Sequence, residues 1–369
     1  MRILAVNGGS SSLRWGLFET EGDVEVAAGA IERVRDPLAA WAEARSALAN
    51  VVPDAVGHRV VHGGERFTEA VRIDRDVMQA IEAQVPLAPV HNPRCLLGIR
   101  EAQELFPEVP HVAVFDTAFH QSMPPAAHRY ALPQRLYEKD RIRRYGFHGS
   151  SHRHASERAA ALLSGGASAF TGVTVHLGNG CSIAAIEDGR SVDTSMGMTP
   201  LEGLMMGTRS GDVDPGVVLD LAARPELGPE RTRTMLNEES GLLGVSGVSS
   251  DLREVEAAAA AGDPQATLAL DMFAHRVRRG IGAALGALGR ADAVVLTGGI
   301  GENAVAMRER ILLRMAGLGL ELDGVANSEC VGREGCISAP DSRIAIFVVR
   351  AQEERLIARE TARVLEGPS

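Results

Sequence analysis

Short, unbroken apolar runs alternate along the chain with longer segments in which apolar residues recur at the spacing of a helix. The apolar runs are bounded by glycine and polar residues and predict buried strands, at residues 2–7, 13–18, 54–61, 111–115, 173–176, 182–186, 292–297 and 343–349. The periodic segments predict helices, at residues 75–84, 94–104, 152–163, 216–223, 251–261, 266–289 and 352–365. Strands that alternate with helices indicate mixed α/β layers.

Two predicted hairpins open the two halves of the chain in the same way. Each consists of an apolar strand, a turn rich in small residues, at 8–12 and 177–181, and a returning strand. Gly8, Ser12 and Leu13 recur as similar residues at a constant offset of 170. An internal repeat of nearly half the chain length indicates two related domains.

The domain boundary is expected near residue 118, in an ordered segment, because no low-complexity linker separates the halves. No strand follows the last predicted helix, so we expect that helix to pack back on an existing domain. The predicted N-terminal domain therefore comprises residues 1–117 and 353–369, and the C-terminal domain comprises residues 118–352.

The composition is that of a globular chain and fits this division. The 369 residues are 45% hydrophobic and 23% charged, a length that suits two domains. A net charge of -10 gives no general attraction to nucleic acid or to an anionic membrane. The chain has four cysteines without a Cys-x-x-Cys pair, and no apolar span of 18 residues. We therefore expect a cytoplasmic protein with reduced thiols.

Lys139 is the only lysine among the 38 basic residues. A Walker A loop needs a lysine after its glycines, and a protein kinase needs one on its third strand. Lys139 lies in neither context. If the protein binds ATP, it does so with another architecture.

Three glycine-rich segments follow predicted strands, at residues 7–12, 177–181 and 298–303. Successive backbone N–H groups in such turns can bind phosphate, although each segment taken alone could also be a plain tight turn. The third resembles the turn from a strand into a helix that faces a ligand. Its glycine spacing is not that of a dinucleotide-binding site.

Arg59 and Arg209 lie in glycine-containing segments that leave room for a bulky anion, although surface arginines are commoner. Asp116 ends an apolar strand, a favoured place for a catalytic carboxylate or for a helix cap. His148, His152 and His154 fit no standard zinc spacing. His148 suits a loop that enters a site, and His152 suits a cap or a core position.

Taken together, these segments resemble the acetate kinase family, within the superfamily of actin, sugar kinases and heat-shock chaperones. The resemblance runs from residue 3 to about residue 360. It rests on ten segments in the family's order, at residues 7–13, 57–65, 87–93, 115–120, 144–149, 176–180, 193–197, 199–215, 249–253 and 298–303.

The resemblance implies roles for individual residues. Asp116, His148 and Arg209 match catalytic positions, and Asn7 and Glu353 match magnesium positions. The positions that hold the substrate carboxylate and its methyl group are Arg59, Val61, Val90, Phe147 and Pro200. The nucleotide-binding positions are Arg14, His176, Leu177, Gly178, Asn179, Gly180, Asp251, Leu252, Arg253, Gly299, Ile300, Gly301, Glu302 and Asn303.

The chain departs from the family's pattern in three places. Arg14 replaces the usual lysine, so the charge is kept but its reach toward phosphate differs. Ala351 and Gln352 replace the usual Thr-Asn before Glu353. The chain is also shorter between the first hairpin and residue 54, where we expect trimmed strands and loops.

The fold implied is two duplicated actin-like (ribonuclease H-like) α/β domains, each with a mixed five-stranded sheet, and a nucleotide cleft between them. The activity implied is reversible, direct in-line transfer of the ATP γ-phosphoryl group to acetate, giving acetyl phosphate and ADP, with Mg²⁺ or Mn²⁺ as cofactor. The resemblance also implies a homodimer.

Three other functions are considered. One is a propionate kinase, since one methylene in an apolar pocket changes binding by only about 1–3 kcal/mol. Another is a nucleotide-binding sensor without catalysis, which would be expected to lose Arg59, His148 or Arg209. The third is a zinc hydrolase built on the histidine cluster.

Overall fold

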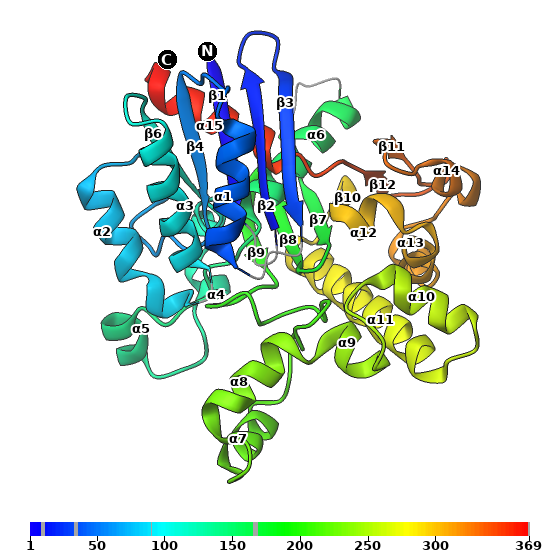
Figure 1. The fold of residues 1–369 in the computed structure, drawn as a ribbon. Helices are drawn as coiled ribbons and strands as arrows, with labels where there is room; N and C mark the ends of the chain where they lie inside the picture. Colours follow the sequence, from blue (N-terminus) through cyan, green and yellow to red (C-terminus); the bar gives the residue numbers. More distant parts are fainter. Residues whose placement is uncertain (9–11, 33–35, 90, 165–168, 368–369) are drawn as a thin grey trace. The chain divides into compact units, whose positions relative to one another are not determined.

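The structure is a computed structural model that describes residues 1–8, 12–32, 36–89, 91–164 and 169–367 (Figure 1). The chain forms two compact units. The first comprises Met1–Gln121, Phe147–His154 and Gln352–Ser369, and the second comprises Ser122–Gly146 and Ala155–Ala351. No helix among the described residues is both long and apolar enough to span a membrane.

The first unit is built on a six-stranded mixed sheet in the order β3-β2-β1-β4-β6-β5. Its strands are β1 (Arg2–Gly8), β2 (Ser12–Glu19), β3 (Val24–Glu32), β4 (Ala55–Val60), β5 (Val71–Arg72) and β6 (His111–Phe115). β1 pairs antiparallel with β2 and parallel with β4, which in turn pairs parallel with β6. The parallel strands consequently end at one edge of the sheet.

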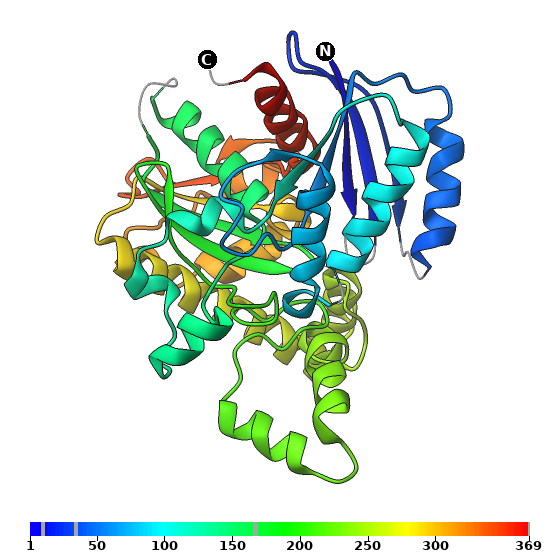
Figure 2. The ribbon, with the colours of Figure 1, turned by 90° about the vertical axis from the view of Figure 1, so that its left-hand side faces the viewer.

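Helices cover both faces of this sheet, and the central strands β1 and β4 are buried along most of their length. The helices of this unit are α1 (Pro37–Leu48), α2 (Arg75–Ala83), η1 (Val85–Leu87), α3 (Asn92–Leu105), η2 (Ala118–Ser122) and α15 (Glu353–Glu366). Along β1, Ile3 and Ala5 pack with Ile357 of α15, whereas Leu4 and Val6 face the opposite core, which includes Trp41 of α1. Figure 2 shows the strands between the red α15 and the blue and cyan helices.

The second unit has a six-stranded sheet of the same topology, in the order β11-β12-β10-β7-β8-β9. Its strands are β7 (Gly172–Leu177), β8 (Cys181–Glu187), β9 (Arg190–Thr194), β10 (Ala293–Thr297), β11 (Gly335–Cys336) and β12 (Ala345–Val348). In both sheets three antiparallel strands lead to two further parallel strands and then to a short antiparallel strand at the edge.

The predicted duplicated α/β fold is confirmed, with six strands in each sheet instead of five. The additional strands, β5 and β11, have two residues each, which is too short for an alternating pattern. The recurrence of similar residues at an offset of 170 does not extend to the strand pairing of the two hairpins. Gly8 pairs with Leu13, whereas Leu177 pairs with Cys181, so the turns differ by one residue.

The remaining helices lie wholly or partly in the second unit. They are α4 (Pro125–His128), α5 (Gln134–Asp140), α6 (Gly149–Ser164), α7 (Pro215–Ala223), α8 (Gly228–Glu238), α9 (Gly241–Ser246), α10 (Leu252–Ala260), α11 (Pro264–Leu288), α12 (Gly298–Asn303), α13 (Val305–Leu312), η3 (Ala316–Leu318) and α14 (Gly324–Glu329). Of these, α7 and α8 pack on each other, away from the sheet of this unit (Figure 1). The longest, α11, packs on β7 and β8. Asp263 caps its start through the N–H groups of Gln265 and Ala266, and Gly289 ends it. Lys139 lies exposed in α5.

The structure differs from the predicted organisation in the region before residue 54 and in the segment Phe147–His154. The region before residue 54 contains β3 and α1, which the chain pattern did not predict; β3 is largely exposed, and its run at residues 26–31 consists mostly of alanine and glycine. Phe147–His154 groups with the first unit, whereas the predicted division assigned it to the second domain. The identification of these units with the predicted domains stays a prediction.

Candidate active site

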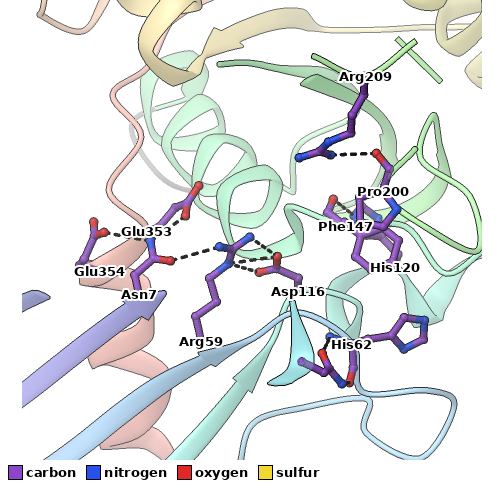
Figure 3. A network of polar contacts seen from close by, with 11 residues as sticks. Asn7, Arg59, His62, Asp116, His120, Phe147, Pro200, Arg209, Glu353 and Glu354 are labelled. Carbon is purple, nitrogen blue, oxygen red and sulfur yellow. Dashed lines mark hydrogen bonds and ion pairs between the residues drawn. The ribbon is translucent and has the colours of Figure 1, made fainter. Parts of the chain in front are cut away.

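Arg59 and Asp116 lie at the ends of neighbouring parallel strands of the first unit (Figure 3). Arg59 is in β4, and Asp116 directly follows β6, where its N–H donates to the carbonyl of Val60. The guanidinium Nε of Arg59 lies 2.9 Å from Oδ1 of Asp116, and its Nη2 lies 2.5 Å from Oδ2. This geometry is a forked ion pair, which fixes the plane of the guanidinium.

The pair is buried, with 12% of the Arg59 side chain and 1% of the Asp116 side chain exposed. Burial raises the pKa of Asp116, and the charge of Arg59 acts against this rise. Burial alone would lower the pKa of Arg59. The charge of the Asp116 carboxylate and its hydrogen bonds have a larger effect in the opposite direction, so the pKa of Arg59 is raised. Because a guanidinium stays protonated in proteins, we describe the pair as ionised.

Asn7 connects this pair to the start of α15. Its side-chain oxygen accepts from Nη1 of Arg59 at 3.2 Å, and its Nδ2 donates to Glu353 at 3.0 Å and to Glu354 at 2.9 Å. Burial raises the pKa of Glu354, and repulsion by the adjacent carboxylate of Glu353 raises it further.

The two carboxylates fit a hard divalent cation, whereas the Asn7 oxygen accepts from Arg59 in this structure. Carboxylate and amide oxygens are the ligands that magnesium prefers, and a cation would relieve the repulsion between Glu353 and Glu354. Among the described residues, no group of three or more His, Cys, Asp or Glu is placed to hold a metal. Sequence reasoning named Asn7 and Glu353 and missed Glu354, although the doubled glutamate at a predicted helix start was a signal.

The segment that carries His148 is tied closely to Asp116. The His148 N–H donates to the Asp116 carboxylate, and Gly149 donates its N–H to the Asp116 carbonyl at 3.0 Å. A Cβ at Gly149 would lie 2.0 Å from that carbonyl oxygen, so only glycine fits there. His148 has a φ of 56°, a conformation that a non-glycine residue adopts only at a cost. The start of α6 is thus held against Asp116.

The predicted methyl pocket is described only in part. Val61 and Phe147 are buried in the first unit, and the ring of Phe147 meets that of His62 edge-on, with centroids 5.5 Å apart. The Phe147 carbonyl is also held by Nε2 of His120 at 3.0 Å. Pro200 belongs to the second unit, and Val90 lies outside the described residues.

In the second unit, Arg209 lies on a loop next to the β7–β8 turn. Its Nη1 donates to the carbonyl of Pro200 at 2.9 Å, and the N–H of Gly207 donates to the Asn179 carbonyl at 3.1 Å. A Cβ at Gly207 would lie 2.3 Å from Oδ1 of Asn179 and 3.1 Å from the Ser250 carbonyl. The Arg209 loop therefore meets two of the predicted nucleotide segments.

The third predicted nucleotide segment also touches the β7–β8 turn. His176 of β7 pairs with Thr297 of β10, and α12 begins directly after Thr297. Gly298 has a φ of 78°, and a Cβ there would lie 2.6 Å from the Leu177 carbonyl. The residues around 176–180 are thus in contact with the start of α12.

The predicted nucleotide residues 251–253 differ in exposure: Leu252 is buried, Asp251 is partly exposed and Arg253 is exposed. Asp251 caps α10 through the N–H of Arg253 at 3.0 Å, and the Arg253 guanidinium, 84% exposed, folds back to the same carboxylate. Arg14, in the first unit, is exposed on β2 opposite Asn7. A cavity of about 240 Å³ between α11 and the 193–212 region contains none of the predicted site residues.

Known proteins resemble the chain over its whole length. The chain matches the Acetokinase family over residues 42–359. The acetate kinase of Thermotoga maritima is 44% identical and aligns over 99% of each chain, and that of Halothermothrix orenii is 46% identical over 100% of each. The crystal structure of Porphyromonas gingivalis acetate kinase has a TM-score of 0.90 at 41% identity and 99% coverage of both chains. A propionate kinase structure from Francisella tularensis has a TM-score of 0.88 at 39% identity, over 98% of this chain and 99% of its own.

The fold and these relatives define a phosphotransferase that uses a carboxyl group as acceptor. The chain belongs to the acetokinase family. Members of this family use ATP or ADP as a substrate, and kinases in general need a divalent metal. The roles of the individual residues named above stay predictions.

Proposed function

We propose that the chain transfers the γ-phosphoryl group of ATP reversibly to acetate, giving acetyl phosphate and ADP. An acetate oxygen forms a bond to the γ-phosphorus in line with the bond that breaks, and ADP leaves with the bridging oxygen and its electron pair. The observation that carries this proposal is the buried, oriented guanidinium of Arg59 beside Asn7 and Asp116.

Arg59 has donors to spare for a carboxylate. A guanidinium has five N–H groups. In the structure Nε and one N–H of Nη2 bind Asp116, and one N–H of Nη1 binds Asn7. Among the described residues, one N–H on each terminal nitrogen has no partner, and two such groups can bind a substrate carboxylate in a fork. The charge of Arg59 would also offset the repulsion between acetate and ATP.

Asp116 serves best as an orienting group in this scheme. A carboxylate nucleophile is already ionised at neutral pH, so the reaction needs no base to deprotonate it. Asp116 holds Arg59 in place and accepts the His148 N–H. His148 and Arg209 are proposed to bind the equatorial oxygens of the transferring group, where negative charge is spread.

Mg²⁺ is the proposed metal, with Asn7 and Glu353 as its protein ligands and Glu354 close by. When bound, the ion neutralises charge on the phosphates. Asn7 orients the two carboxylates through its amide N–H groups. The nucleotide is proposed to contact Arg14 and the segments 176–180, 251–253 and 299–303.

A hydroxamate assay for acyl phosphate tests the function. The native chain with ATP, Mg²⁺ and acetate should form acetyl phosphate, and Arg209→Ala should lower the rate about 10²–10³-fold, as loss of a donor to a charged transition state does. If no acyl phosphate forms with acetate or propionate while ATP still binds, the chain is a nucleotide-binding sensor instead.

Propionate is the second candidate substrate, because one structural relative is a propionate kinase. Val61 narrows the predicted pocket for the methyl group. We therefore expect kcat/KM to be higher for acetate than for propionate, and the reverse order would overturn the acetate assignment.

We also propose a homodimer in the cytoplasm. The dimer is supported by the family resemblance, and the cytoplasmic location by four cysteines that are all free thiols in the structure. Light scattering after size exclusion should give about twice the chain mass of 39.1 kDa. The mass of a single chain would contradict the dimer.

A further inference from the structure

Arg308 of α13 is a fully buried charged side chain to which the proposed reaction gives no role. None of its surface is exposed, and no carboxylate of the described residues pairs with it. Burial lowers its pKa, yet a guanidinium keeps its proton. A buried charge without a counter-ion is costly, so the groups around it need an explanation.

The charge of Arg308 is stabilised by main-chain carbonyls at the ends of two short helices. At α12, Nη1 donates to Gly301 at 3.0 Å and to Glu302 at 2.9 Å. At α14, Nη2 donates to the carbonyls of Asn327 at 2.8 Å and Cys330 at 2.7 Å, and Nε donates to Oδ1 of Asn327 at 2.7 Å. These carbonyls are the groups that a helix leaves without partners at its C-terminal end, where positive charge is favourable.

The helix α12 depends on such support. It has six residues, far fewer than an isolated helix needs in water. Its N-cap residue, Thr297, makes no capping hydrogen bond with its side chain. Groups from outside the helix hold its far end. Arg308 donates to the carbonyls of Gly301 and Glu302, the N–H of Gly332 donates to the Glu302 carbonyl at 3.4 Å, and the N–H of Ala351 donates to Oε1 of Glu302 at 2.9 Å.

We infer that Arg308 is a positioning residue for nucleotide binding. It stabilises the conformation of the segment Gly299–Asn303 by donating to the carbonyls of Gly301 and Glu302. This inference rests on the proposed function, in which that segment contacts the nucleotide. Gly298, just before the segment, lies against the Leu177 carbonyl, and the far end of the segment is bound by Arg308. Losing the guanidinium removes two of the hydrogen bonds that hold this far end.

The test compares two substitutions with a matched control. Arg308→Met fills the site but removes the guanidinium that donates to the carbonyls of α12 and α14. Arg308→Lys keeps the charge on a smaller group with three donors, which cannot reach both helix ends in a fork. The control is Arg278→Met, because Arg278 of α11 donates in the same way to the last carbonyls of α13, at 2.8 Å for Arg310 and 3.1 Å for Ile311.

A positioning role predicts that the substitution changes the KM for ATP much more than the KM for acetate. Arg308→Met should raise the KM for ATP about tenfold or more, with the KM for acetate within about twofold, as the loss of charged hydrogen bonds implies. Arg308→Lys should show a smaller rise of the same kind. Arg278→Met should lower the Tm without changing either KM.

Calorimetry of ADP binding provides a readout that does not need turnover. Weaker ADP binding in Arg308→Lys than in the native chain supports the inference even if the native chain makes no acyl phosphate, a result that would overturn only the proposed function. If Arg308→Met does not fold, Arg308→Lys decides. Unchanged ADP affinity and ATP KM in a folded Arg308→Lys would overturn the positioning role.

Discussion

The two sheets share one topology but present different chemistry at corresponding strand ends. In the first unit, β1, β4 and β6 end near Asn7, Arg59 and Asp116, whose side chains bind one another. In the second unit, the corresponding β7 and β10 end in the glycine-rich segments 177–181 and 298–303, whose contacts involve the main chain. One copy of the fold thus presents interacting side chains at its strand ends, and the other presents closely approaching backbone segments.

Breaking the side-chain site should have the largest effect. Arg59→Met should abolish detectable acyl phosphate formation, a loss of about 10³-fold or more. It should also lower the free energy of unfolding by about 3–5 kcal/mol, because buried Asp116 loses its counter-ion. Acyl phosphate formation and urea unfolding of the same preparation measure both.

A double substitution separates the two losses. Arg59→Met with Asp116→Leu removes both buried charges, so much of the stability should return while the activity stays absent. If the double variant regained activity, Arg59 would have no part in binding the substrate.

The backbone site should respond less, and only toward the nucleotide. Gly298→Ala introduces a Cβ 2.6 Å from the Leu177 carbonyl at a positive φ, a strain of about 1–3 kcal/mol. The KM for ATP should rise about tenfold, and the KM for acetate should stay unchanged. Gly282→Ala in α11 is the control, because a Cβ there meets nothing within 4 Å. Equal changes in both KM values would contradict a separate nucleotide role.

The smallest effect is a loss of stability in acid that arises in the first unit. Burial lowers the pKa of His120 to about 4 and that of His58 well below its usual value, so both are neutral when folded. The unfolded chain takes up these protons below about pH 6.5 and the folded chain does not, so stability should fall as the pH drops from there toward 4.

Unfolding titrations between pH 7 and pH 4 measure this slope. His120→Gln should make the slope shallower, because it removes one titrating group while its amide can still donate to Phe147. An identical slope in the native chain and in His120→Gln would rule out His120 as a source.

Much of this molecule follows from residue patterns, and the exceptions have physical causes. Apolar runs predict β4, β6 and β10 because these strands are buried on both faces. Parallel neighbours end at one edge, which is why Arg59 and Asp116 meet. The pattern of apolar and polar residues does not indicate which side chains bind main-chain carbonyls. It therefore predicts an exposed Arg308 on an amphipathic helix, although this residue is fully buried.

Lys139 on the surface of α5 gains a meaning from the proposed reaction. Acyl phosphates acylate free amines, so an enzyme that releases acetyl phosphate exposes its own surface to a reagent that attacks lysine. Arginine keeps its proton at neutral pH and is a poor nucleophile. Because 37 of the 38 basic residues are arginine, the chain has a single ε-amine that acetyl phosphate can acetylate. Acetylation of side chains by the product would therefore remove at most one positive charge.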